Sequence, residues 1–300
     1  MPLPRIAVIY HDHCADGFTA AWVAKTRFGE EATLIPYSQG NPLPPIPPIQ
    51  PGGQVYLLDL ALTPDYVTEL QRTFGEKNVF VLDHHKSSME KFSNTLPPSS
   101  RVVFDMNHSG AMLAWTALFP EIPPPNLVRY VEDRDLWAWA LPYSKEVNTA
   151  LSSYPLELAA WDTLNERLGS EPLDKNHAMV MTGRALLRYK DNLVATAIER
   201  TGVLGQFPTG ETALFVNSSI LASDIGNAEY NTKTPIVAVW TQQKDGRYYY
   251  SLRGGPDSPD LSKLAAHYGG GGHAKAAGFT APTMVHTPIK DLDRHNSPER

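Results

Sequence analysis

The sequence has a single cysteine among its 300 residues, and it has no long uninterrupted hydrophobic run. One thiol, Cys14, cannot form an internal disulfide, which favours a reducing compartment. No apolar stretch reaches the roughly 20 residues that a membrane-spanning helix needs, and the N-terminus lacks the basic and apolar regions of a signal peptide. We therefore expect a soluble, cytoplasmic protein without membrane segments.

An excess of basic residues is also missing, because 26 Lys and Arg stand against 32 Asp and Glu, a formal net charge of −6. Basic residues do not alternate with aromatic ones along a stripe, so the sequence gives no sign of binding to long single strands. A site built from carboxylates contributes to such a charge, and phosphate-containing substrates are not excluded. The length and the 42% hydrophobic fraction suffice for two folded domains.

Short apolar runs that end in acidic or imidazole residues organise the first half of the chain. The runs with the polar residues that follow them are 5–10 with His11, 54–58 with Asp59, and 79–82 with Asp83, His84 and His85. Between them, the apolar spacing predicts helices over about 16–28 and 64–74. This alternation predicts a parallel sheet, and the polar residues would gather in the crevice beyond the carboxyl ends of its strands.

The pattern changes in the second half of the chain. Residues 145–200 are predicted to be mostly helical, and short strands follow from Gly202 onward. The predicted fold class is therefore α/β, with a parallel-sheet N-terminal domain joined by a helical linker to a smaller mixed α/β domain. The expected boundaries are 1–190 for the first domain, 205–282 for the second, and 283–300 for a polar tail.

The polar residues of the first domain have the chemistry of a metal centre. They are His11, Asp16, Asp59, His84, His85 and, in the segment EDRDLWAW, Asp133 or Asp135. Carboxylates gathered at one sheet edge repel one another unless a cation neutralises them or some of them bind protons. Mixed imidazole and carboxylate ligands suit Mn²⁺, Fe²⁺ or Zn²⁺, and a bridging carboxylate permits a two-metal centre that activates water for attack on phosphorus. For any one residue alone, a helix cap or a surface ion pair is the alternative.

A glycine run in the second domain gives an independent signal. Gly269 to Gly272 and the following His273 would leave backbone N–H groups available to an anion. Arg253 and Lys275 could add positive charge. We interpret Gly270, Gly271, Gly272, His273, Arg253 and Lys275 as phosphate-binding residues, with a flexible linker as the alternative.

With these positions in view, the chain resembles the DHH phosphoesterase family, in the RecJ-like and short-oligonucleotide phosphodiesterase branch with a DHH-associated C-terminal domain. The segments similar to the successive family motifs are HDHCADG, LLDLA, LDHH, EDRD and GGGGHAKAAG. The resemblance implies two divalent ions, usually Mn²⁺, that serve to hydrolyse phosphodiester or phosphoanhydride bonds. It also implies an active site in the cleft between the two domains.

The resemblance also implies roles for individual residues. His11 would bind the first ion, Asp16 and His84 the second, and Asp59 both. Asp83 would orient a ligand, and His85 would face the substrate phosphate or the leaving group. The remaining ligand would be Asp133 or Asp135, and we prefer Asp133 because it directly follows the predicted helix.

The sequence departs from the family pattern at Cys14, which stands where an aspartate is expected. A thiolate at this position would favour the softer ions Zn²⁺ or Fe²⁺. In the alternatives, Asp12 or a water molecule fills the position, the first ion binds weakly, or Cys14 is a small buried residue without a metal contact. The identity of the ions, with Mg²⁺ among the candidates, stays open.

The leading hypothesis is a metal-dependent phosphodiesterase that acts on short single-stranded oligonucleotides or on linear or cyclic dinucleotides. The first alternative is a pyrophosphatase or polyphosphatase with the same chemistry, against which the glycine run argues. The second is a non-catalytic nucleotide-binding module whose first metal site has decayed at Cys14. A homodimer is compatible with the sequence.

Overall fold

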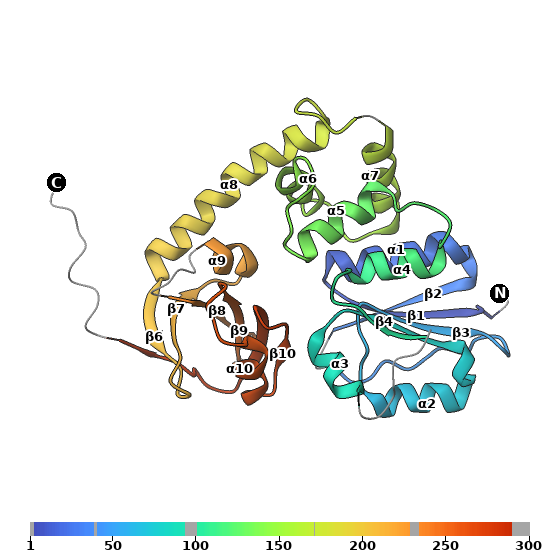
Figure 1. Ribbon diagram of the computed structural model, residues 1–300, viewed down its shortest axis with the longest axis horizontal. Coiled ribbons are helices and arrows are strands. Elements are labelled where there is room, and N and C mark those ends of the chain that lie inside the picture. Colours follow the sequence, from blue (N-terminus) through green and yellow to red (C-terminus); the bar gives the residue numbers. More distant parts are fainter. Residues whose placement is uncertain (1–2, 39–40, 94–100, 171, 229–233, 290–300) are drawn as a thin grey trace. The chain divides into compact units, whose positions relative to one another are not determined.

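The computed structural model describes residues 3–38, 41–93, 101–170, 172–228 and 234–289 (Figure 1). It divides into two units, Met1–Leu187 and Arg188–Arg300. Among the described residues, the first unit contains a five-stranded parallel sheet and the second a seven-stranded mixed sheet. The predicted fold class, a parallel α/β region followed by a mixed α/β region, is confirmed.

The sheet of the first unit has the strand order β2-β1-β3-β4-β5, and every neighbouring pair is parallel. Its strands are β1 (Ile6–His11), β2 (Ala32–Tyr37), β3 (Gln54–Leu58), β4 (Val79–Asp83) and β5 (Val102–Phe104). From β1 the chain moves to β2 on one side and then returns to β3 on the other. The connection direction therefore reverses between β1 and β3, and open α/β sheets bind ligands beyond the strand ends at such a point.

Helices cover both faces of this sheet, with α1 and α4 on one face and α2 on the other (Figure 1). Because side chains alternate along a strand, Val8 and Tyr10 pack on the first face and Ala7 and Ile9 on the second. The helices of the first face are α1 (Ala15–Phe28), α4 (Gly110–Leu118), α5 (Asn126–Asp135), α6 (Ser144–Leu151) and α7 (Leu158–Ser170). Those of the second face are α2 (Pro64–Phe74) and α3 (Lys86–Phe92). Short 3₁₀ turns, η1 (Gly29–Glu31) and η2 (Glu76–Asn78), precede β2 and β4.

The long helix α8 (Ala178–Thr201) contains the division between the two units, and it lies at the end of the region 145–200 that the sequence predicts to be mostly helical. Among the helices that the structure describes, this one included, none is both long and apolar enough to cross a membrane. The predicted polar tail falls partly on residues 290–300, which lie outside the described residues.

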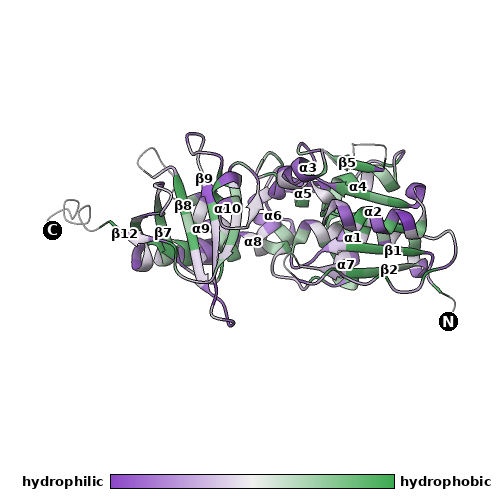
Figure 2. Cartoon of the chain, turned by 90° about the horizontal axis from the view of Figure 1, so that it is seen from below, coloured by the Kyte–Doolittle hydropathy of each residue, from purple (hydrophilic) through white to green (hydrophobic). Residues whose placement is uncertain are grey.

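The sheet of the second unit has the order β10-β11-β9-β8-β7-β6-β12. Its elements are β6 (Val203–Gln206), β7 (Thr212–Asn217), α9 (Ala222–Ala228), β8 (Ile236–Gln242), β9 (Tyr248–Gly254), α10 (Leu261–His267), β10 (Gly271–Gly272), β11 (Ala276–Ala281) and β12 (Thr287–Pro288). The pair β7–β8 is parallel and the other pairs are antiparallel, which makes the sheet mixed. Figure 2 shows the strand β8 as strongly hydrophobic, in keeping with its place inside the sheet.

Candidate metal centre

Three adjacent strands of the first unit end in polar residues that lie close together. Among the described residues of this unit, three groups have donor atoms within 4.8 Å of one another. They are His11 with Cys14 and Asp59, Asp16 with His84 and Asp135, and Asp59 with Asp83 and His85. The structure thus brings together every metal ligand predicted from the sequence except Asp133.

Asp59 lies between the first two groups. Its Oδ2 is 3.3 Å from Nδ1 of His11, and its Oδ1 is 3.1 Å from Nε2 of His84. The residue has a φ of 59°, a left-handed conformation that aspartate tolerates better than most residues. Burial raises the pKa of Asp59, but the hydrogen bonds from His11 and His84 outweigh it and lower the pKa below its usual range. Its carboxylate is therefore ionised, and its two oxygens face different histidines.

Asp16 is held by the N-terminus of a helix far away in the sequence. Its Oδ2 accepts a hydrogen bond of 2.6 Å from the amide of Gly110, and its Oδ1 one of 2.9 Å from Ala111. The start of α4 also lies so close to Asp59 that position 110 must be glycine, because a Cβ atom there would lie 2.4 Å from the Cβ of Asp59. Burial and the nearby charges of Asp59 and Asp135 raise the pKa of Asp16 well above its usual range.

His84 is buried at the centre of these carboxylates. Its Nε2 lies 3.7 Å from Oδ2 of Asp16 and 3.4 Å from Oδ2 of Asp135, in addition to its contact with Asp59. Burial lowers the pKa of His84, but the carboxylates more than compensate and raise it to about 10. Without a cation the imidazolium therefore supplies positive charge at the place where the carboxylates converge.

The structure reverses the preference for Asp133 over Asp135. The helix α5 includes both aspartates and ends at Asp135, whose carboxylate is the one that lies beside His84. The carboxylate of Asp133 accepts hydrogen bonds from the amides of Ala140 at 2.8 Å and Leu141 at 3.4 Å. Asp133 therefore holds the loop that follows α5.

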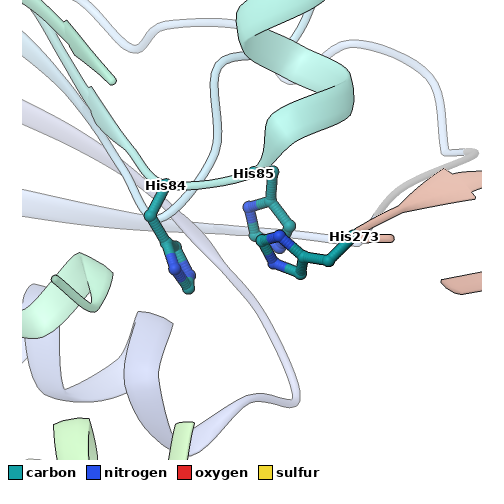
Figure 3. Close-up of side chains that lie close together, drawn as sticks. All are labelled: His84, His85 and His273. Carbon is teal, nitrogen blue, oxygen red and sulfur yellow. The ribbon is translucent and has the colours of Figure 1, made fainter. Parts of the chain in front are cut away.

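Asp83 and His85 form a pair at the end of β4. Oδ1 of Asp83 lies 2.7 Å from Nδ1 of His85 and also accepts hydrogen bonds from the amides of His84 and His85. Burial lowers the pKa of His85, but the charge and hydrogen bond of Asp83 raise it to about 9. Figure 3 shows His84 and His85 on the segment between β4 and α3, and their ring centroids are 4.8 Å apart.

Cys14 precedes α1, and its Sγ belongs to the group with His11 and Asp59. Burial and the charges of Asp59, Asp135 and Asp16 raise the pKa of the thiol well above its usual range. Without a cation the sulfur therefore stays protonated.

The donor set fits divalent cations. The pKa of Asp135, like that of Asp16, is raised by burial and by the charge of Asp59. In addition, the buried Oδ2 of Asp83 has no hydrogen-bond partner among the described residues. Negative groups gathered in a buried place are stabilised by cations, and mixed imidazole and carboxylate ligands suit first-row transition metals.

Sequence reasoning missed the backbone donors of the site. Ser109 and Gly110 indicate the start of a helix, and the Ser109 hydroxyl does accept a hydrogen bond from the amide of Met112. No sequence signal, however, connects the amides of Gly110 and Ala111 with Asp16, which is 94 residues away from Gly110.

In the second unit, Arg253 lies on β9 and is half-buried. Its guanidinium donates hydrogen bonds to the Oγ atoms of Ser251 and Ser223, at 3.1 and 2.6 Å. His273 lies on the turn between β10 and β11 and is also half-buried; Figure 3 labels it, and it belongs to the second unit.

Two expectations for the second unit need correction. The ammonium of Lys275 donates hydrogen bonds to the carbonyls of Pro256 and Ser258, at 2.8 and 2.6 Å, and to the Ser258 hydroxyl at 3.1 Å. An ammonium has three donors, so these partners leave none for a phosphate. The geometry therefore gives Lys275 the role of holding the loop at 256–258.

Three backbone donors of the glycine run serve the fold itself. The amides of Gly269, Gly270 and His273 donate to carbonyls of Ala266, Ala265 and Ala276, and Gly271 and Gly272 pair with β11. Position 270 needs glycine because a Cβ atom there would lie 2.1 Å from the carbonyl oxygen of Gly278. The run therefore packs β10 closely against β11.

Comparisons with known proteins agree with this description. Residues 213–293 match the family model of the DHHA1 domain. A protein of Acanthamoeba polyphaga mimivirus, itself uncharacterized, is 30% identical over 293 residues, which cover 91% of this chain and 66% of that protein. The chain thus spans slightly less than two thirds of the length of this relative.

The solved structures are less similar in sequence to this chain than the mimivirus protein is. An exopolyphosphatase-related protein from Bacteroides fragilis is 11% identical, with a TM-score of 0.49 over 93% of this chain and 87% of that chain. RecJ from Thermus thermophilus, in complex with Mn²⁺, is 18% identical, with a TM-score of 0.46 over 92% of this chain and 49% of that chain.

The DHHA1 match lies in the second unit, and the LDHH motif lies at the end of β4 in the first. The match to the DHHA1 domain supports the resemblance to the DHH family with a DHH-associated C-terminal domain.

Proposed function

We propose that the protein is a divalent-metal-dependent phosphoesterase that hydrolyses phosphodiester bonds of short oligonucleotides or of linear or cyclic dinucleotides. The position of Asp59 is the observation that carries the proposal. One of its oxygens faces His11 and the other faces His84, as a carboxylate shared by two cations requires.

The side chains around Asp59 divide into two ligand sets. His11 and Cys14 would hold one cation together with Asp59, and Asp16, His84 and Asp135 would hold the other. When bound, two divalent cations supply an activated water molecule and neutralise the charge that develops on the phosphoryl group. The amides at the start of α4 would keep the carboxylate of Asp16 in its ligand orientation.

His85 would contact the substrate. Asp83 holds Nδ1 of its ring, and Nε2 would donate a hydrogen bond to a phosphate oxygen or to the leaving group. Asp83 thus acts as the positioning residue of both histidines through one carboxylate oxygen.

We propose Mn²⁺ as the working cation, with Zn²⁺, Fe²⁺ or Mg²⁺ as the alternatives. Imidazole and carboxylate ligands suit Mn²⁺, whereas a thiolate at Cys14 would shift the preference to Zn²⁺ or Fe²⁺. Metal content measured in the wild type and in a Cys14→Asp variant distinguishes these cases, because the aspartate should favour the harder ions.

In this proposal, residues 1–190 form the catalytic domain and residues 205–282 the substrate-binding domain. Arg253 and His273 are the side chains of the second domain that we propose as contacts of the substrate. The guanidinium of Arg253 is held in place by two serines, and arginine matches the geometry of phosphate oxygens.

The test is hydrolysis of short RNA and DNA oligonucleotides, linear and cyclic dinucleotides and pyrophosphate by the full chain, across a panel of divalent metals. We expect Mn²⁺-stimulated release of mononucleotides, abolished by His84→Ala and kept by the control His267→Ala, whose side chain is exposed at the end of α10. A preference for pyrophosphate would favour the polyphosphatase alternative.

The absence of any hydrolysis by the metal-loaded protein would contradict the proposal. Nucleotide binding without hydrolysis would instead favour a non-catalytic module, and turnover restored by Cys14→Asp would locate the loss at the first cation.

A further inference from the structure

Two tryptophans follow the candidate ligand Asp135 on the loop between α5 and α6. Trp137 and Trp139 have φ values of 55° and 52°, and Tyr143 in the same loop has 54°. Bulky side chains rarely adopt this left-handed conformation, which persists only where the surrounding structure enforces it. The fold therefore holds the backbone of both tryptophans in a costly conformation just after the candidate ligand Asp135 in the chain.

Asp133 enforces this arrangement. Its backbone oxygen accepts hydrogen bonds from the amides of Ala138 at 2.9 Å and Trp139 at 3.3 Å. Its carboxylate accepts those of Ala140 and Leu141. One buried residue thus fixes consecutive amides of the loop, so the backbone that carries both rings is positioned before any ligand binds.

The two indoles differ from the tryptophans that build the core. Trp22, Trp115 and Trp161 donate their indole N–H to protein oxygens and are buried. Trp137 and Trp139 are only half-buried, and neither packs against the hydrophobic core among the described residues. Within the same residues, neither indole N–H has a hydrogen-bond partner. Packing in the fold therefore does not account for their strained positions.

The two indole rings are of a kind that can bind a nucleobase. Their centroids are 4.8 Å apart in an edge-to-face arrangement, and the Lys145 ammonium lies 5.8 Å from the centroid of the Trp139 ring. Aromatic side chains bind bases by stacking and tolerate any sequence, since every base has a π face. A nearby cation adds attraction for the phosphate backbone.

The spacing along the chain between Trp137 and the candidate ligand Asp135 is compatible with the length of one nucleotide. Trp137 is two residues after Asp135, so the two Cα atoms are at most about 7 Å apart. A base joined through its sugar to a phosphate at the metal centre can therefore reach the first ring.

We propose that Trp137 and Trp139 form a stacking platform for a nucleobase of the substrate whose phosphate lies at the metal centre. The inference rests on the proposed function and narrows it. A substrate with a base, such as a dinucleotide, can use the platform, whereas pyrophosphate and polyphosphate cannot.

The test compares substrates and variants in one cycle. The metal-loaded full chain is given a dinucleotide and the two analogues in which one base is replaced by an abasic tetrahydrofuran sugar. We expect Trp137→Ala and Trp139→Ala each to lower kcat/KM for the dinucleotide by about 10-fold, mainly through KM. The alanine variants should turn over the analogue that lacks the stacked base as fast as the wild type does. The variants Trp137→Phe and Trp139→Phe should keep most of the wild type's preference for the dinucleotide over that analogue.

Tyr189→Ala is the matched control, because this ring is 65% exposed on α8 and removing it should not alter the preference for a base. Equal losses on the dinucleotide and on both abasic analogues would overturn the platform, because the loop would then only position Asp135.

Binding of the same substrates, measured by calorimetry, separates this inference from the proposed function. The wild type could fail to hydrolyse these compounds and still bind the dinucleotide about 10-fold more tightly than one abasic analogue. If the alanine variants lose this difference in affinity, the stacking platform is supported although the proposed hydrolysis is not. Equal affinity of the wild type for all three compounds would overturn it.

Discussion

The two units use their polar residues in different ways. In the first, Asp59 and His84 come from strand ends, are buried, and face other ionisable groups. In the second, the ammonium of Lys275 and the amides of Gly269, Gly270 and His273 donate to carbonyls of the fold itself. Topology alone gathers side chains at strand ends, whereas a backbone donor serves a ligand only if no other strand uses it.

The strongest expected effect comes from Asp59→Asn, which removes the charge shared by both ligand sets while nearly keeping the shape. We expect hydrolysis to fall by at least about 100-fold, because even residues that only support metal ligands cost 10–100-fold when changed. Kinetics and metal content check this. A variant with normal metal content and normal turnover would contradict the shared role of Asp59.

The next test compares two aspartates of α5. Asp135→Asn should weaken metal binding by at least about 10-fold, while Asp133→Asn should change it little and instead destabilise the loop by about 1–2 kcal/mol. Metal titration and thermal unfolding of both variants separate the two roles. The opposite pattern would restore Asp133 as the ligand.

The choice between these aspartates shows where sequence reasoning ends. With 3.6 residues per turn, positions two apart on a helix point about 200° apart, so only one of the two can face the sheet edge. Which one does so depends on the rotation of α5, and that is fixed by packing of Leu127, Val128 and Val131 in the core. The apolar runs ending in His11, Asp59 and Asp83, in contrast, made the sheet and the strand-end residues predictable.

A smaller effect is expected from a change in the second unit, where we infer that Lys275 serves the fold and not a ligand. Lys275→Met should destabilise the protein by about 1–3 kcal/mol, because the oxygens of the buried residue Ser258 lose their donor. Lys263→Met, at an exposed position of α10, is the matched control and should be neutral. Unchanged stability in Lys275→Met combined with a higher KM would return Lys275 to phosphate binding.

The smallest effect concerns pH. Nδ1 of His286 lies 2.8 Å from the Tyr250 hydroxyl, its ring stacks on Phe215, and burial lowers its pKa from 6.5. The unfolded chain therefore binds this proton at a higher pH than the folded one. The contribution of the neutral His286 to the free energy of unfolding is fully present above pH 6.5 and declines as the pH falls below it. Urea unfolding between pH 5 and 8 should show a smaller decline in His286→Gln, and identical profiles would exclude this contribution.

The most direct measurement is anomalous diffraction from crystals of the full chain grown with Mn²⁺. Our account predicts two peaks, one beside His11 and Cys14 and one beside Asp16, His84 and Asp135, with Asp59 in contact with both. A single peak, or peaks away from Asp59, would contradict the central claim that this carboxylate joins two cation sites.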